Sequence, residues 1–212
     1  MLSRQQFSQR TRRLLRSTPA ERRIAAFGLK EGDVAIDCGA NIGSVTAELA
    51  RRGALVYAFE PNPDAFAVLE RRFAKSANVE LRRQAVLDHA GTVRLYFHVD
   101  AVDDPVGASP GSSLLPFKGN VDPARYLEVE AIDLSDFILG LGRPVNLLKL
   151  DVEGVECPIV HRLIDTGAIT HIEIALVEIH DRHISELSDD YRVLRARLVD
   201  EGLADRVRTD WQ

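Results

Sequence analysis

Residues 34–43, Val-Ala-Ile-Asp-Cys-Gly-Ala-Asn-Ile-Gly, limit the fold of this chain more than any other segment. The apolar run 34–36 predicts a short buried strand that leads directly into Asp37. Gly39 and Gly43 then bracket a tight turn, and a helical spacing of apolar residues follows at once. A strand, a glycine turn and a helix N-terminus in this order let the backbone approach a ligand closely.

The same strand-helix alternation continues along the chain. It predicts an α/β, Rossmann-like fold, a mostly parallel sheet with helices on both faces. The segments 84–87 and 92–97 resemble a hairpin added to the sheet edge. The other expected strands are 34–37, 55–59, 79–82, 127–132, 146–150 and 171–179, and the expected helices are 42–52, 63–75, 134–139, 154–165 and 188–201.

The chain length of 212 residues fits one domain, which we expect over 31–212. Before it, 1–30 reads as an arginine-rich helical segment, although a transit peptide or a contact with an acidic partner is also open. The Pro- and Gly-rich stretch 99–125 is a candidate lid over the substrate. After the last expected helix there is room for one strand near 207–209, so the usual final hairpin is truncated or a second copy completes the sheet edge.

The glycine spacing indicates the kind of cofactor. A dinucleotide loop would place glycine where Asp37 stands, and an acid there would repel a pyrophosphate. S-adenosylmethionine has a sulfonium, an amino group and no phosphate, so it fits better than NAD. Glu60, at the tip of the next expected strand, is placed to bind the hydroxyls of a ribose. An NAD-dependent oxidoreductase and a cofactor-binding module without catalysis are the alternatives.

Polar residues at two further strand ends are the catalytic candidates: Asp151 with Glu153, and Glu178 with His180. A carboxylate beside an imidazole suits general-base work, and a structural histidine is the alternative. Lys149 in a buried strand needs a carboxylate partner, and Glu156 reads as a capping or solvated residue. His183 and Asp181 near His180 invite a metal interpretation, but the spacing is not that of a ligand set, so no metal is expected.

Composition limits the partners. The net charge of −5 argues against a nucleic-acid partner, and no apolar run is long enough for a membrane span. The two cysteines suit a reducing compartment and a cytoplasmic location. We therefore expect a small molecule with a hydroxyl group as the acceptor.

Several motifs together resemble the FkbM-type methyltransferases, which depend on S-adenosylmethionine. The motifs are Asp37 to Gly43, Phe59 to Pro63, Ala85 to Asp88 with Gly91, Ser112 to Leu114, Lys149 to Glu156, and Val177 to His180. The resemblance implies methyl transfer to a hydroxyl of a sugar, lipid or natural product. It places the methionine end of the cofactor at the glycine loop, the ribose at Glu60 and the adenine at Gln84 and Ala85. The expected cofactor-binding residues are Asp37, Gly39, Ala40, Asn41, Gly43, Ser44, Glu60, Pro61, Asn62, Gln84, Ala85 and Asp151.

Overall fold

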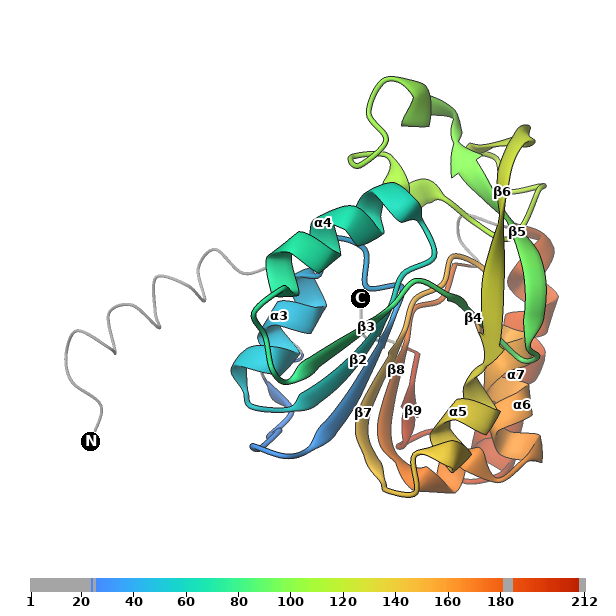
Figure 1. Cartoon of the computed structure of the whole chain (residues 1–212). Helices are drawn as coiled ribbons and strands as arrows, with labels where there is room; N and C mark the ends of the chain where they lie inside the picture. The colour runs from blue at the N-terminus through green and yellow to red at the C-terminus, as the bar shows by residue number, and fades with distance from the viewer. Residues whose placement is uncertain (1–23, 25, 181–184, 210–212) are drawn as a thin grey trace.

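A six-stranded parallel sheet forms the centre of the molecule (Figure 1). The computed structural model describes residues 24, 26–180 and 185–209. The strand order is β3-β2-β1-β7-β8-β9, so the direction of winding reverses between β1 and β7. Ligands of such sheets bind outside the carboxyl ends of the strands at this reversal. The strands are β1 (Val34–Cys38), β2 (Leu55–Phe59), β3 (Val79–Arg82), β7 (Val145–Leu150), β8 (Ile172–Val177) and β9 (Val207–Arg208).

Helices cover both faces of this sheet, as expected (Figure 1). Side chains alternate along each strand, so Ala35, Val56 and Leu147 pack with Leu49 of α3 in one core, whereas Ile36 and Leu148 join a larger core on the other face. The helices are α3 (Ser44–Arg51) and α4 (Pro63–Phe73) on one face, and α5 (Leu134–Gly140), α6 (Glu156–Asp165) and α7 (Ser188–Asp200) on the other.

The expected hairpin of 84–87 with 92–97 is wrong. β4 (Ala85–Leu87) and β5 (Gly91–His98) belong to a separate three-stranded sheet, in which β6 (Val121–Asp133) lies between them. β6 pairs in parallel with β4 and antiparallel with β5. β6 is thirteen residues long and pairs with both neighbours. The expected strand, 127–132, contains only part of it.

The expected lid segment 99–125 contains short regular elements. It contains the 3-10 turns η1 (Val99–Val102) and η2 (Ser109–Gly111), and its last five residues are already part of β6. The expected helix 154–165 begins two residues late, because Glu153 (φ 63°) and Gly154 (φ 120°) have a backbone that a helix does not allow. Two further 3-10 turns, η3 (Ala168–His171) and η4 (Ser185–Leu187), precede β8 and α7.

The two ends of the chain are described only in part. The expected segment 1–30 lies largely outside the described residues, as do Asp181 and His183, but Ile24 is fully buried in the core beneath α3. At the other end, the one expected strand is present: β9 pairs in parallel with β8.

Candidate active site

The two glycines of the first loop have separate structural tasks. Gly39 has a φ of 76°, and a Cβ placed on it would lie 1.9 Å from the carbonyl oxygen of Asp151. Only glycine therefore lets the end of β1 approach the end of β7 this closely. Gly43 (φ 85°) begins α3, and a Cβ there would meet Phe73 of α4 at 2.5 Å. The loop is thus shaped by contact with both neighbouring elements.

A cavity, here called the inner cavity, opens above the carboxyl ends of β1, β2 and β7. Most of its walls are apolar, and the loop between η1 and β6 covers it. Its lining residues are Gly39, Asn41, Phe59, Glu60, Pro61, Gln84, Ala85, Val86, Leu95, Ser109, Pro110, Ser112, Ser113, Leu114, Asp151, Val152 and Glu153.

Glu60 is a buried acidic group that lines the inner cavity. One carboxylate oxygen accepts a hydrogen bond from the backbone N–H of Asn41 and the other from that of Asn62, both at 2.8 Å. Burial raises the pKa of Glu60 to about 7, although these two amides act in the opposite direction. Each oxygen keeps a further acceptor position, so the carboxylate is oriented and able to accept hydroxyl donors.

Seven of the twelve expected cofactor-binding residues line the inner cavity: Gly39, Asn41, Glu60, Pro61, Gln84, Ala85 and Asp151. The other five stand behind its wall. Asn62 is buried, caps the N-terminus of α4 and donates to Ser112 of the covering loop. Ala40 is packed against α4, and Gly43 and Ser44 start α3. Asp37 is fully buried.

Lys149 joins the strand ends beneath the cavity and has the carboxylate partner that the sequence predicts. Its ammonium group lies 3.1 Å from Asp151 and 3.5 Å from Asp37, its register partner on β1. It also donates to the carbonyl oxygens of Cys38 and Gly39. Burial alone would lower the pKa of Lys149, but Asp151 and Asp37 outweigh it and hold the pKa above its usual value. Asp37 also accepts from the hydroxyl of Thr46.

A second, wider cavity of about 770 Å³, here called the outer cavity, adjoins the first. Polar and charged side chains dominate its lining, and Glu153 and Pro110 line both cavities. The two cavities therefore meet at Glu153. The outer cavity is lined by His98, Asp100, Asp104, Gly107, Ala108, Pro110, Gly111, Lys118, Gly119, Asn120, Glu153, Glu178 and His180.

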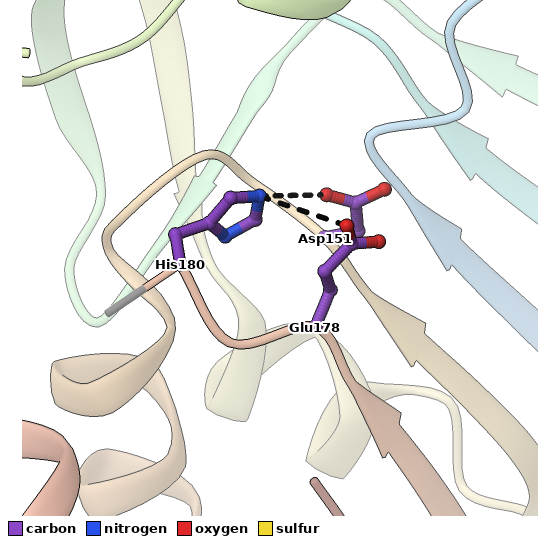
Figure 2. Close-up of side chains that lie close together, drawn as sticks. All are labelled: Asp151, Glu178 and His180. Carbon is purple, nitrogen blue, oxygen red and sulfur yellow. Dashed lines mark ion pairs between the residues drawn. The ribbon is translucent and has the colours of Figure 1, made fainter. Parts of the chain in front are cut away.

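The four expected catalytic residues come together at this meeting point. The Nε2 atom of His180 lies 3.7 Å from Asp151, 3.5 Å from Glu153 and 3.9 Å from Glu178. Figure 2 shows the ring and the carboxylates of Asp151 and Glu178 directed toward one another. Glu178 and His180 lie beyond the end of β8, so strand alternation does not place them, but both line the outer cavity.

The acids set the protonation of this cluster. Burial alone would lower the pKa of His180, but Glu156, Glu153 and Asp151 outweigh it and raise that pKa to about 9. Burial and the neighbouring Asp151 raise the pKa of Glu178 to about 7. Lys149 holds the pKa of Asp151 below its usual value despite burial. An imidazole that is already protonated at neutral pH is a poor base, so the carboxylates suit that task better.

Glu156 organises the loop that carries these groups. It is fully buried and accepts hydrogen bonds from the backbone N–H groups of Val152 and Gly154 and, at 2.6 Å, from the hydroxyl of Tyr191. It also lies 3.1 Å from Nδ1 of His180. Both expectations for Glu156 are wrong: the N-cap of α6 is Val155, which makes no side-chain cap, and Glu156 is buried and holds the preceding loop.

Several functional positions on the covering loop carried no role in the sequence reasoning. The side-chain amide of Asn41, after β1, donates to Ser109 at 2.9 Å, and that of Asn62, after β2, donates to Ser112 at 3.1 Å. These two hydrogen bonds hold the covering loop. Lys118, which is buried, pairs with Glu153 at 2.5 Å. The Ser112 to Leu114 motif was the available signal, whereas a single lysine in a loop gives none.

The parallel sheet, the glycine loop after β1 and the acid after β2 define a Rossmann-like methyltransferase fold of class I. The model of the methyltransferase FkbM domain family matches residues 37–206, and the chain belongs to this family. It is a methyltransferase, which displaces the oxidoreductase alternative.

Two curated relatives differ in how much they share. The 31-O-demethyl-FK506 methyltransferase FkbM of Streptomyces tacrolimicus is 30% identical over 72% of this chain and 67% of its own length. The ribosomal RNA small subunit methyltransferase A of Thermotoga petrophila is 43% identical over 30% of this chain, and the match spans only 24% of that enzyme. Among solved structures, an rRNA methylase from Streptococcus thermophilus matches 31% of this chain and 37% of its own, with 25% identity and a TM-score of 0.29.

These relatives correct one expectation. Excluding nucleic acid as a partner was wrong, because proteins that share part of this sequence are ribosomal RNA methyltransferases. Net charge averages the whole chain and does not describe the local surface that meets a substrate. On the membrane question, none of the helices in the described residues is long and apolar enough to cross a bilayer.

Proposed function

We propose that this protein transfers a methyl group from S-adenosylmethionine to the oxygen of a hydroxyl group. The observation that carries the proposal is Glu60, whose carboxylate is fixed by two backbone amides in the wall of a mostly apolar cavity. Such a carboxylate suits a ribose diol, which donates two hydrogen bonds. The apolar walls at Val86, Leu95 and Leu114 suit an adenine ring. These residues fit the cofactor.

S-adenosylmethionine supplies an electrophilic methyl group on its sulfonium. On this proposal the glycine loop and Asp151 would hold the methionine end of the cofactor, close to Glu153. The chain contributes mainly by aligning the acceptor oxygen with the methyl carbon and excluding water. As the new carbon–oxygen bond forms and the sulfur–carbon bond breaks, the hydroxyl proton passes to a carboxylate. Glu153 is our choice, since it lines both cavities.

The covering loop, which is the part of the expected lid 99–125 between η1 and β6, acts as the lid in this proposal. The inner cavity measures about 100 Å³, which is smaller than the roughly 300–1,000 Å³ of small-molecule sites. Entry of a nucleoside therefore requires the segment around Ser109 and Ser112 to move away and return.

The choice of oxygen as the acceptor has separate support. The Streptomyces tacrolimicus relative, whose match covers 72% of this chain, is named for methylating 31-O-demethyl-FK506, a reaction at oxygen. The ribosomal RNA enzymes match only a small part of the chain. The outer cavity is wide enough for a sugar, a lipid head or one ring of a natural product.

Two measurements test the proposal. Calorimetric titration should show binding of S-adenosylmethionine and none of NAD, with affinity at least tenfold weaker in Glu60→Gln. Glu80→Gln, an exposed acid on β3 paired with Arg82, is the matched control and should bind normally. Release of S-adenosylhomocysteine is then measured with sugars, hydroxylated lipids, macrolides and small-subunit ribosomal RNA. Absence of cofactor binding contradicts the proposal, and turnover on RNA bases alone contradicts oxygen as the acceptor.

A further inference from the structure

We propose that Asp151, Glu178 and His180 form a binding site for a divalent cation of the Mg²⁺ or Mn²⁺ class, which holds the acceptor's hydroxyl oxygen. The inference rests on the proposed function for its catalytic role, but not for the existence of the site. It differs from the expectation from sequence, which included no metal.

The distances leave room for an ion shared by the three side chains. One ligand atom from each of the three side chains lies within 4.8 Å of the others. From Nε2 of His180, the nearest oxygens of Asp151 and Glu178 are 3.7 and 3.9 Å away, too far for hydrogen bonds. Two atoms that each lie about 2.1 Å from one ion are about 3–4 Å apart, so this spacing leaves room for a cation between them.

The surroundings of His180 are those of a metal ligand. A ligating histidine almost always presents its other ring nitrogen to a carboxylate or carbonyl, which fixes the ring orientation. Here Nδ1 lies 3.1 Å from Glu156, which is itself fully buried and held by Tyr191 and two backbone amides. The ring is 5% exposed. Its Nε2 is thereby directed at Asp151 and Glu178 (Figure 2).

Asp151 is oriented in a similar way. Its Oδ2 atom lies 3.1 Å from the ammonium of Lys149, and its Oδ1 atom is the one that faces His180. One carboxylate oxygen of Asp151 thus pairs with Lys149 of β7, and the other is directed toward His180.

The charge of the cluster also favours a cation. Five carboxylates gather here, those of Asp37, Asp151, Glu153, Glu156 and Glu178, against two lysines and one imidazole. Buried charges require compensation. A divalent ion bound to a neutral imidazole supplies more positive charge than the imidazolium does.

The position of the site explains its use. Asp151 lines the inner cavity, whereas Glu178 and His180 line the outer cavity. An ion between them lies where the methyl group and the acceptor meet. Coordination of the acceptor's hydroxyl oxygen lowers the pKa of that hydroxyl, so its proton passes more readily to Glu153, and the oxygen then takes the methyl group from sulfur.

The test is a titration of the metal-stripped full chain with Mn²⁺, followed by electron paramagnetic resonance. We expect one bound ion per chain, and at least tenfold weaker binding in Glu178→Gln and in His180→Gln. Asp100→Asn, an exposed acid that lines the outer cavity outside the cluster, should bind normally. Circular dichroism of each variant checks that it is folded.

The outcomes separate this inference from the proposed function. Absence of Mn²⁺ binding, or binding unchanged in both variants, overturns the site. Methyl transfer that continues at full rate with a chelator overturns its catalytic role. Mn²⁺ binding in a protein that does not bind S-adenosylmethionine leaves the metal site standing and defeats the proposed function.

Discussion

The inner and outer cavities share one wall but are built differently. The inner cavity is small and mostly apolar, and backbone amides fix its acid Glu60. The outer cavity is wide, and side chains from the covering loop and from the end of β8 supply its charges. A binding site whose ligand is the same in every relative can be built into the sheet. A binding site whose ligand differs between relatives is better formed by loops, which tolerate changes of sequence. The difference predicts that substitutions at the inner site harm folding and cofactor binding, and those at the outer site mainly harm turnover.

The largest effect is expected from the buried lysines. Lys149→Met leaves Asp37 buried and unpaired and should lower the free energy of unfolding by about 3–5 kcal/mol. Lys118→Met removes the lysine partner of Glu153, a carboxylate that is partly solvated, and should lower the free energy of unfolding by about 1 kcal/mol. Urea unfolding of both measures the difference. Adding Asp37→Asn to Lys149→Met should recover part of the lost stability, because it removes the unpaired charge. Equal losses of stability for the two lysine variants would contradict the predicted difference between the two cavities.

Gly39→Ala should have the next largest effect. The new methyl group would meet the carbonyl oxygen of Asp151, so we expect a loss of at least 2 kcal/mol in stability together with weaker cofactor binding. Gly167→Ala is the control, since Gly167 has nearly the same φ (77°) but nothing within 4 Å of the new carbon. It should cost about 1 kcal/mol and leave cofactor binding alone. Thermal unfolding and calorimetry would show whether close approach or backbone angle matters more.

The pH dependence of cofactor binding should follow Glu60. If the ribose requires the carboxylate, affinity should be about tenfold weaker at pH 6 than at pH 8, because the pKa of Glu60 is about 7. The raised pKa means that the folded apo protein binds this proton more tightly than the unfolded chain. The contribution of Glu60 to stability therefore declines as pH rises from about 4.5 to about 7. Calorimetry at several pH values should give a flat profile for Glu60→Gln, and a slope that persists in this variant would assign the proton elsewhere.

The smallest effect concerns the covering loop. Ser112→Ala removes the hydrogen bond from Asn62, worth about 1 kcal/mol, and should speed cofactor release about fivefold. Ser76→Ala, at the opposite end of α4, should not change the release rate. Stopped-flow displacement measures both. An unchanged rate in Ser112→Ala would mean that the loop does not limit release.

The sequence allowed most of the sheet to be predicted. The alternation of apolar runs and helical patterns gave all six strands of the main sheet, since each strand and helix there is a local feature with its own period. The small sheet was not predicted correctly, because insertion of β6 between β4 and β5 depends on pairing between segments that are far apart in the chain. Local patterns contain no information about which edge a strand will choose.

The candidate site divides in the same way. Glu60 and the glycines could be located because each follows an apolar strand at a fixed distance. The burial of Asp37 beneath the cavity could not, because it depends on the register of β1 with β7. Lys118 and the two serines that meet Asn41 and Asn62 depend on the path of a long loop, which has no period to read.

The pairing of Asp37 with Lys149 has a consequence for how the molecule assembles. These residues are more than a hundred positions apart in the chain, yet they lie directly opposite each other on the neighbouring strands β1 and β7. Bringing together residues that are far apart in the chain costs conformational entropy before any favourable contact forms. Such contacts therefore tend to form slowly. The first half of the chain holds the glycine loop and Glu60, whereas Lys149, the counterion of Asp37, arrives only with β7. During synthesis on the ribosome, cofactor recognition should therefore appear only after the second half has emerged.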